Sequence, residues 1–225
     1  MHYMHTSTKD AIAAKFIELV CNSHNPYERV SVTKIVKTLD IDRKTFYNNF
    51  DNTTDLVIWI FRSELAEMLR GAEFYQSTLV YPSNELHDKY EELPCYARFS
   101  LPDGRLDEHR FFRALCHLFN NNEEYYQRMF SYPCYLDFFT YLQTLYMPAI
   151  YDDILIMLNS RELPKECIDF LAEYHTMGLI GRIPYRYSHK KQPLPEENLG
   201  LMWNYAHDTL KMTIEYALKQ YNKEQ

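Results

Sequence analysis

The sequence predicts an all-α protein, on three observations. Only 5 of the 225 residues are Gly, and the hydrophobic fraction of 46% is large enough for a real core. Many long side chains with few glycines disfavour a turn-rich all-β protein. Most of the chain also has apolar residues at helical spacing, with cap residues before them. We expect an N-terminal three-helix head, residues 1–51, followed by a larger helical body, residues 52–225.

The net charge of −7 argues at first against a nucleic-acid partner, because phosphate repels an acidic chain. The charge is unevenly distributed, however. Residues 1–50 contain seven Lys and Arg against five Asp and Glu, which gives +2 and leaves −9 for residues 51–225. The objection therefore applies to the body and not to the head, for which we expect modest non-specific DNA affinity.

Cysteine usage and hydropathy indicate the compartment. The five cysteines are an odd number without a C-x-x-C pair, which favours a reducing compartment over a disulfide framework. The apolar run Leu56–Phe61 is far shorter than the ~20 residues that span a bilayer. No His or Cys pair has the spacing of a tight metal site, and phosphate-loop and hydrolase motifs are missing from the sequence. We expect a cytoplasmic protein with no membrane partner, no metal, no cofactor and no enzymatic activity.

The head is predicted to contain a helix-turn-helix. An amphipathic helix, Thr8–Asn22, precedes two short helices, Val32–Thr38 and Arg43–Asn49. Ser31 and Asp42 stand at the N-cap positions of the short helices. The last of the three helices has apolar residues on one face and basic and polar residues on the other. Two short helices with a tight link, the second with a basic outer face, are typical of a helix-turn-helix.

The body begins with a helix that Asn52 caps, with Asp55 as the capping-box acid. The start of this helix, Leu56–Phe61, is apolar on all sides and must be buried. Residues 76–108 contain several prolines and little periodicity, so we expect loops with at most one short helix there. A proline-containing link, residues 184–195, separates the last two helices. The other expected helices are Glu108–Phe119, Glu123–Tyr132, Tyr135–Tyr146, a helix to Leu158 with Pro148 in its first turn, Lys165–Ile183 and Glu196–Tyr221.

The segments Val30–Val36 and Ile41–Phe50, followed by Asp55–Leu56, resemble the TetR family of bacterial transcriptional regulators. The string T-F-Y-x-x-F combined with the pattern before it and the acid-Leu step after it carries the resemblance, which covers the head and the start of the next helix. The resemblance implies an all-α homodimer with a DNA-binding head and a divergent C-terminal domain for ligand binding and dimerisation.

Three positions depart from the commonest pattern of the family. Asp40 stands where the turn often has Gly, and Asp tolerates a left-handed conformation better than most residues do. Asn49 replaces a frequent His, and Thr53 replaces a frequent Lys that approaches phosphate. The last two replacements weaken the expected contacts with the DNA backbone without removing the motif.

A recognition helix presents hydrogen-bonding side chains to base edges, while other groups hold the phosphates. Arg43 and Lys44 are the candidates for direct readout, because an Arg side chain can bind guanine bidentately. A solvated basic helix without DNA contacts is the alternative. The further candidates are Thr45 and Asn48 for base edges, and Tyr47, Asn49, Thr33 and Lys34 for phosphates.

The aromatic-rich stretch of the body, residues 125–146, is the expected effector region, because ligand sites are largely apolar with a few polar anchors. Aromatic residues at helical spacing are also typical of a core, which is the alternative for each residue taken singly. We expect an unidentified small hydrophobic or aromatic effector. The candidate residues are Tyr126, Phe130, Tyr135, Phe138 and Phe139, with Tyr174 and His175 as polar anchors.

The last two helices are expected to form the dimer interface, as the resemblance implies. Gly178 and Gly181 thin the first of these helices and allow another backbone to approach. In the second, residues at steps of three and four form a seam that suits a four-helix bundle. The candidate interface residues are Ile168, Leu171, His175, Gly178, Leu179, Leu199, Trp203, Ala206 and Leu210.

The resemblance implies a ligand-responsive, sequence-specific transcription regulator. We expect a repressor that binds a palindromic operator in double-stranded DNA as a homodimer and that a small effector releases. The alternative is a helical interaction protein or co-regulator of the same fold, which acts through a protein partner instead of an effector pocket of its own.

Overall fold

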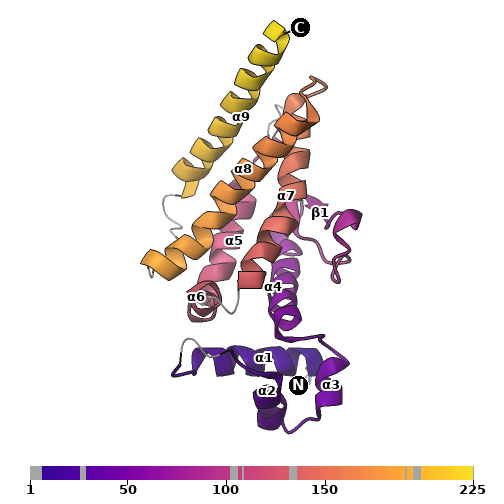
Figure 1. Cartoon of the computed structure of the whole chain (residues 1–225), viewed down its shortest axis with the longest axis vertical. Helices are drawn as coiled ribbons and strands as arrows, with labels where there is room; N and C mark the ends of the chain where they lie inside the picture. Colours follow the sequence, from indigo (N-terminus) through magenta and orange to yellow (C-terminus); the bar gives the residue numbers. More distant parts are fainter. Residues whose placement is uncertain are drawn as a thin grey trace.

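The described part of the chain is all-α apart from two short strands, as the sequence predicts. The computed structural model describes residues 7–25, 29–101, 106–107, 109–131, 136–190, 192–194 and 199–224. The helices are α1 (Thr8–Cys21), α2 (Val32–Leu39), α3 (Arg43–Tyr47), α4 (Thr53–Leu69), α5 (His109–Asn121), α6 (Glu123–Ser131), α7 (Leu136–Leu158), α8 (Lys165–Pro184) and α9 (Leu199–Glu224). Figure 1 shows α1–α3 grouped at one end of an elongated molecule, and the end of α9 at the other.

The first three helices pack around a small apolar core. Phe16 of α1, Ile35 of α2 and Phe46 of α3 are fully buried, and Phe50 joins them just after α3. Ser31 and Asp42 are N-caps as predicted, and each accepts a hydrogen bond from the backbone N–H three residues later, at 3.2 and 2.6 Å. Figure 1 shows α2 and α3 on the side of α1 that faces away from the body, so α2 and α3 present their outer faces to solvent.

The turn between α2 and α3 depends on Asp40. This residue has φ 54° and ψ 42°, and its N–H donates to the carbonyl of Val36. A left-handed conformation costs an ordinary L-residue roughly 1–2 kcal/mol, and Gly avoids this cost. We expect Asp40→Ala to lower the free energy of unfolding by about 1 kcal/mol and Asp40→Gly to leave it unchanged or higher. Urea unfolding of both variants measures the difference, and equal stability would contradict the role of Asp40 in the turn.

Helix α4 connects the head with the body. Asn52 caps it as predicted, because its Oδ1 accepts the N–H of Asp55 at 3.0 Å. Asp55 does not close the expected capping box, since its carboxylate accepts the N–H of Asp51 and the hydroxyl of Tyr90 instead. The apolar start of the helix is buried on several sides, as expected, through Leu56, Val57, Ile60 and Phe61.

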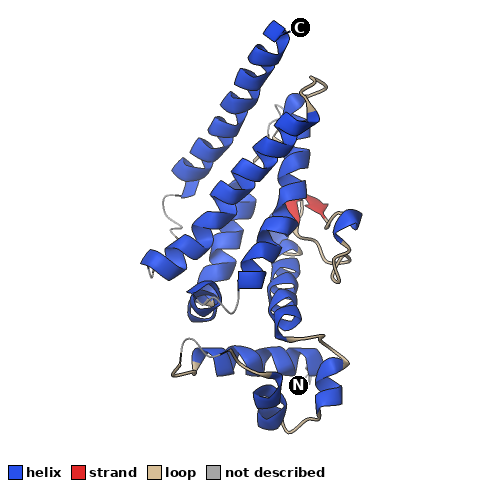
Figure 2. Cartoon of the chain, viewed as in Figure 1, coloured by secondary structure: helices blue, strands red, loops and turns tan. Residues whose placement is uncertain are grey.

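The segment between α4 and α5 contains structure that the sequence did not predict. Two strands, β1 (Thr78–Val80) and β2 (Tyr96–Arg98), pair antiparallel, and two 3-10 turns, η1 (Ala72–Phe74) and η2 (Asn84–Leu86), flank β1. Figure 2 shows the strands beside the long helices. Three-residue strands are too short for a visible alternation of apolar and polar residues. A contact with a distant helix holds the strands in position: the hydroxyl of Tyr96 donates a hydrogen bond to Asp153 of α7 at 2.8 Å.

Helix α7 is continuous, which corrects the expected break before Pro148. Proline lacks an N–H and normally disrupts a helix interior. Tyr146 before it and Ile150 after it are both buried, and α7 packs along α8 over much of its length. This packing on both sides of Pro148 keeps the two halves in one helix.

The expected link after α8 is also partly helical. A π-helical segment, η4 (Tyr185–Lys190), continues α8 directly, and its Tyr187 is fully buried against Phe130 with ring centroids 5.9 Å apart. The aromatic contact holds the segment against α6, where the sequence pattern indicated only a loop.

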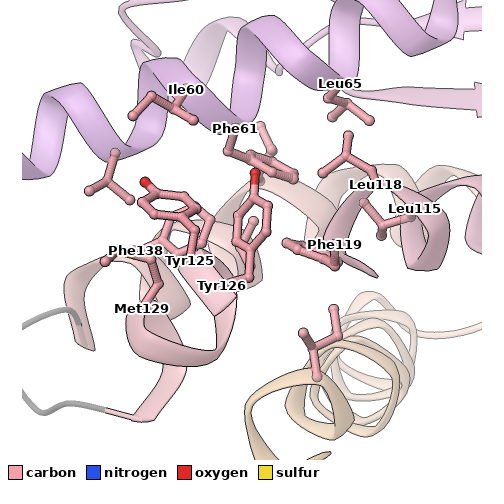
Figure 3. Packing of buried hydrophobic residues seen from close by; sticks show 14 of the residues in the cluster. Ile60, Phe61, Leu65, Leu115, Leu118, Phe119, Tyr125, Tyr126, Met129 and Phe138 are labelled. Atoms are coloured by element: carbon pink, nitrogen blue, oxygen red, sulfur yellow. The ribbon is translucent and has the colours of Figure 1, made fainter. Parts of the chain in front are cut away.

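Two apolar clusters form the core. The larger includes the core of α1–α3 and continues through α4–α7 to η4, and Figure 3 shows its aromatic centre. The smaller lies between the second half of α7, α8 and α9, and includes Ile154, Leu171 and Leu210. Among the described residues, no helix is long and apolar enough to cross a membrane.

Candidate functional site

The outer face of α2 and α3 carries most of the predicted DNA-binding residues. Tyr47 of α3 is 53% exposed, while its neighbour Phe46 is fully buried. Helix α3 is thus amphipathic, with its polar side toward solvent. The exposed candidates are Thr33, Lys34, Arg43, Lys44, Tyr47 and Asn48, whereas Thr45 and Asn49 are half-buried.

Hydrogen bonds hold several of these side chains in place. Arg43 Nη2 donates to Thr33 Oγ1 at 2.8 Å and so links the two helices. Asn49 Nδ2 donates to the carbonyl of Thr45 at 2.8 Å, which uses part of its amide within the chain. Hydrogen bonds from Thr45 lower the pKa of the exposed Asp42. The surface can therefore offer cationic and amide donors to an anionic polymer, with a fixed carboxylate at the start of α3.

Arg29 is an exposed cation that the sequence reasoning missed. Its Nε donates to Thr53 Oγ1 at 3.0 Å and its Nη2 to Thr54 Oγ1 at 2.5 Å, at the first residues of α4. Thr53 stands where the TetR pattern that the sequence resembles often has Lys. The absence of a Lys at position 53 is the sequence signal from which a second cation nearby, Arg29, could have been inferred.

Three of the aromatic candidates for the effector region, Tyr126, Phe130 and Phe138, pack into the core. Phe138 stacks with Phe130 at 5.5 Å between ring centroids, and Phe130 lies 5.6 Å from Phe119. Tyr126 is fully buried, and its hydroxyl donates to Glu64 Oε2 at 2.7 Å. Figure 3 shows the rings of Phe119, Tyr126 and Phe138 among the other buried side chains of this cluster. The rings pack against one another, which supports the core alternative. Phe139 is half-buried, and Tyr135 lies outside the described residues.

The two predicted polar anchors point in different directions. Tyr174 is 63% exposed and stacks on Phe170 with ring centroids 6.1 Å apart. His175 is buried, and its Nε2 has no hydrogen-bond partner among the described residues. Only His175 is therefore placed inside the helical bundle.

Burial lowers the pKa of His175 from its ordinary value of 6.5. The folded chain keeps the imidazole neutral, while the unfolded chain takes up a proton below that value. The stabilisation is therefore fully present above pH 6.5 and is lost as the pH falls toward the lowered pKa. We expect the melting temperature to fall between pH 7.5 and 5.5, and to fall less in His175→Leu. The control His24→Gln, at an exposed position, keeps the wild-type slope; equal slopes for all three proteins would exclude this role of His175.

The predicted dimer residues divide between the two sides of α8 and α9. Ile168, Leu171 and Leu210 belong to the smaller core cluster of the same chain, and His175 is buried as well. Leu179 and Ala206 are half-buried, and the side chains of Leu199 and Trp203 lie outside the described part. Gly178 is exposed, and a Cβ there would meet no atom within 4 Å. The outward face of α8 and α9 carries other large apolar residues: Phe170, Tyr174, Met177, Tyr205, Met212 and Tyr216.

A buried polar network between α4, α7 and residues 88–93 is a second feature that the sequence reasoning missed. Arg62 of α4 is 0% exposed. Its Nη1 donates to Asp88 Oδ2 at 3.0 Å and to Tyr141 Oη at 2.8 Å, and its Nη2 donates to the carbonyls of Tyr90 and Leu93. Burial and the hydrogen bond to Asp88 raise the pKa of Tyr141, so its hydroxyl stays protonated. This network attaches the segment before β2 to the helical bundle.

In the comparisons with known proteins, sequence similarity to a curated relative covers only a part of the chain. No family model matches the chain. A stretch of 68 residues is 38% identical to the HTH-type dhaKLM operon transcriptional activator DhaS of Lactococcus lactis subsp. lactis (strain IL1403). The match covers 30% of this chain and 35% of that protein, so the chain spans about a third of the length of the curated relative it matches.

The similarity to a solved structure extends over almost the whole chain. The dihydroxyacetone kinase operon activator DhaS superposes with a TM-score of 0.56 over 91% of this chain and 97% of that one, at 19% sequence identity. This similarity establishes the fold. Both similar proteins are named as transcriptional activators and neither as an enzyme, in agreement with the expectation of a non-enzyme.

Proposed function

We propose that the chain is a DNA-binding transcription regulator of the TetR type. The proposal rests above all on α3, whose exposed Arg43, Lys44 and Asn48 stand opposite the buried Phe46 in a helix-turn-helix. The activators to which the chain is similar support the same function. In this proposal residues 1–51 form the DNA-binding head, and residues 52–225 form the dimerisation and effector domain.

The proposed assembly is a homodimer that reads a palindromic operator. Its interface would use the outward face of α8 and α9, because the inward face is occupied by the smaller core cluster. Phe170, Tyr174 and Met177 are exposed there beside Gly178, and large apolar patches of this kind mark interaction surfaces. Two heads in one dimer then contact successive major grooves.

The sense of regulation that we propose is activation. The sequence led us to expect a repressor, but the two similar proteins are both named activators of an operon. A regulator of either sense needs a ligand or partner that binds its two conformational states differently. The effector belongs to the body, and its chemistry is considered below.

The recognition surface is tested by a double substitution, Arg43→Ala with Lys44→Ala. Each base contact of this kind contributes about 1–3 kcal/mol, so we expect operator affinity to fall at least tenfold. The matched control, Lys165→Ala with Lys219→Ala, removes two exposed Lys side chains from α8 and α9, far from α3 (Figure 1). Fluorescence anisotropy with the operator beside the gene measures both. Equal affinity of wild type and the Arg43/Lys44 variant would refute the assignment.

A second candidate is a co-regulator that acts through a different protein. The exposed apolar face of α8 and α9 favours it as well, because this face fits any helical partner. Sedimentation of the purified chain separates the two candidates. If the wild-type chain is a dimer and Met177→Glu dissociates it, the homodimeric regulator is supported. If the wild-type chain is a monomer and does not bind the operator, the co-regulator is supported.

A further inference from the structure

A half-open pocket of about 250 Å³ lies beside the junction of the head with the body. We call it the junction pocket. Helix α4, helix α7 and the segment around η2 each contribute to its wall, so it forms only when these distant parts of the sequence come together. Its lining residues are Asp55, Ile58, Leu86, His87, Asp88, Lys89, Tyr90, Tyr141, Thr144 and Leu145.

The charges that face the junction pocket are paired. Lys89 Nζ lies 2.6 Å from Asp55 Oδ2, and Arg62 Nη1 lies 3.0 Å from Asp88 Oδ2. An anionic ligand would have to compete with Asp51 and Asp55 for Lys89. A cationic ligand would have to compete with Lys89 and Arg62 for the carboxylates. The electrostatics therefore favour an uncharged ligand.

The polar and apolar side chains that line the junction pocket fit a ligand with hydroxyl groups on a short carbon skeleton. The carboxylates accept hydrogen bonds and the ammonium of Lys89 donates them, while Ile58, Leu86 and Leu145 supply apolar contact. The volume corresponds to about eight water molecules at roughly 30 Å³ each, which is smaller than a typical drug site. We propose that the junction pocket binds a small uncharged polyhydroxylated molecule.

The junction pocket is in direct contact with the head. Lys89 also pairs with Asp51 at 2.8 Å, and the hydroxyl of Tyr90 donates to Asp55 Oδ1 at 2.6 Å. Burial and the hydrogen bond to Asp55 raise the pKa of Tyr90, so this hydroxyl remains a donor. A ligand that moves Lys89 or Tyr90 therefore changes the contacts at the start of α4.

An aromatic cage extends this contact to α1. The ammonium of Lys9 lies 5.5 Å from the ring centroid of Tyr90, 5.6 Å from that of Phe50 and 5.4 Å from that of Trp59. Cation–π contacts of this kind are attractive, and they join α1 to both α4 and the pocket wall. Transmission from the pocket to DNA affinity rests on the proposed function, whereas ligand binding itself does not.

The binding site is tested by calorimetry on the full chain with three probes of similar size: uncharged erythritol, cationic Tris and anionic erythronate. We expect saturable binding of erythritol and binding of the other two at least about tenfold weaker. Absence of saturable erythritol binding, or equal binding of all three probes, would overturn the proposal.

Two neighbouring threonines of α7 provide a matched pair of variants. Thr144 lines the junction pocket and Thr140 does not, yet both are exposed and each hydroxyl donates to the carbonyl four residues earlier. Thr144→Phe fills the pocket and should weaken erythritol binding at least about tenfold, while Thr140→Phe should change it less than about twofold. Equal effects of the two variants would place the ligand elsewhere.

The coupling between the junction pocket and the head is tested by a separate variant. Lys9→Met removes the cation from the aromatic cage and should leave the dissociation constant of erythritol within about twofold of wild type. It should abolish any effect of erythritol on operator affinity and on Trp59 emission. Erythritol binding without operator binding by any form would refute the proposed function and leave the site intact. Operator binding without erythritol binding would refute the site and leave the function intact.

Discussion

Replacing Arg62 by Met is expected to lower the free energy of unfolding by about 3–5 kcal/mol, the range typical of breaking a buried ion pair. The guanidinium is fully buried, and Asp88, its ion-pair partner, has a side chain that is only 4% exposed. Without the guanidinium, the Asp88 carboxylate and the carbonyls of Tyr90 and Leu93 lose their cationic donor inside the protein. Chemical unfolding followed by circular dichroism, at fixed protein concentration, measures the loss.

Two further variants show whether the loss comes from the stranded charge. Asp88→Asn in the Arg62→Met background removes the unpaired carboxylate, so the double variant should be more stable than the sum of the single losses predicts. Lys165→Met is the control, because Lys165 pairs with Asp169 on the exposed side of α8 and should lose less than about 1 kcal/mol. A similar small loss for Arg62→Met would mean that the buried network contributes little.

The head could be predicted from the sequence in detail because its signals are local. Ser31, Asp42 and Asn52 are caps that act within three residues, and the apolar face of each short helix is complete within its own segment. The turn at Asp40 followed from the same local pattern. Local hydrogen bonds and helical spacing fix these elements before any long-range contact forms.

The body was less predictable because distant contacts decide its structure. Pro148 normally breaks a helix, but the burial of Tyr146 and Ile150 holds α7 together. Arg62 stands in an ordinary helical segment, and its partners come from residues 88–93, which have no periodic pattern. The junction pocket depends on the same long-range contacts and could not be inferred from spacing.

Helix α8 shows why an apolar pattern cannot by itself select the face of the proposed dimer. Helix α8 has apolar residues on both sides: Ile168 and Leu171 face the core, while Phe170, Tyr174 and Met177 face solvent. Periodicity alone cannot distinguish the side that packs within the chain from the side left for a partner. Only the position of α7 and α9 against α8 makes the distinction.

Replacing Phe138 by Ala is expected to lower the free energy of unfolding by about 3–5 kcal/mol, because a large buried side chain leaves a cavity that its neighbours fill only in part. Phe138 is 1% exposed and lies within 6.4 Å of Phe61, Phe130 and Tyr126 between ring centroids. Leu136→Ala, at an exposed position on the same helix, should cost less than about 0.5 kcal/mol. Urea unfolding measures both.

The same variant distinguishes a packed core from an effector site in this region. If the aromatic residues form the core, Phe138→Ala reduces stability and leaves the dissociation constant of erythritol unchanged, because the junction pocket does not include Phe138. If they form a ligand site, the loss of stability is small, since the cavity already exists, and the affinity for an aromatic ligand changes instead. The stacking of Phe130 between Phe138 and Tyr187, at 5.5 and 5.9 Å, supports the first outcome.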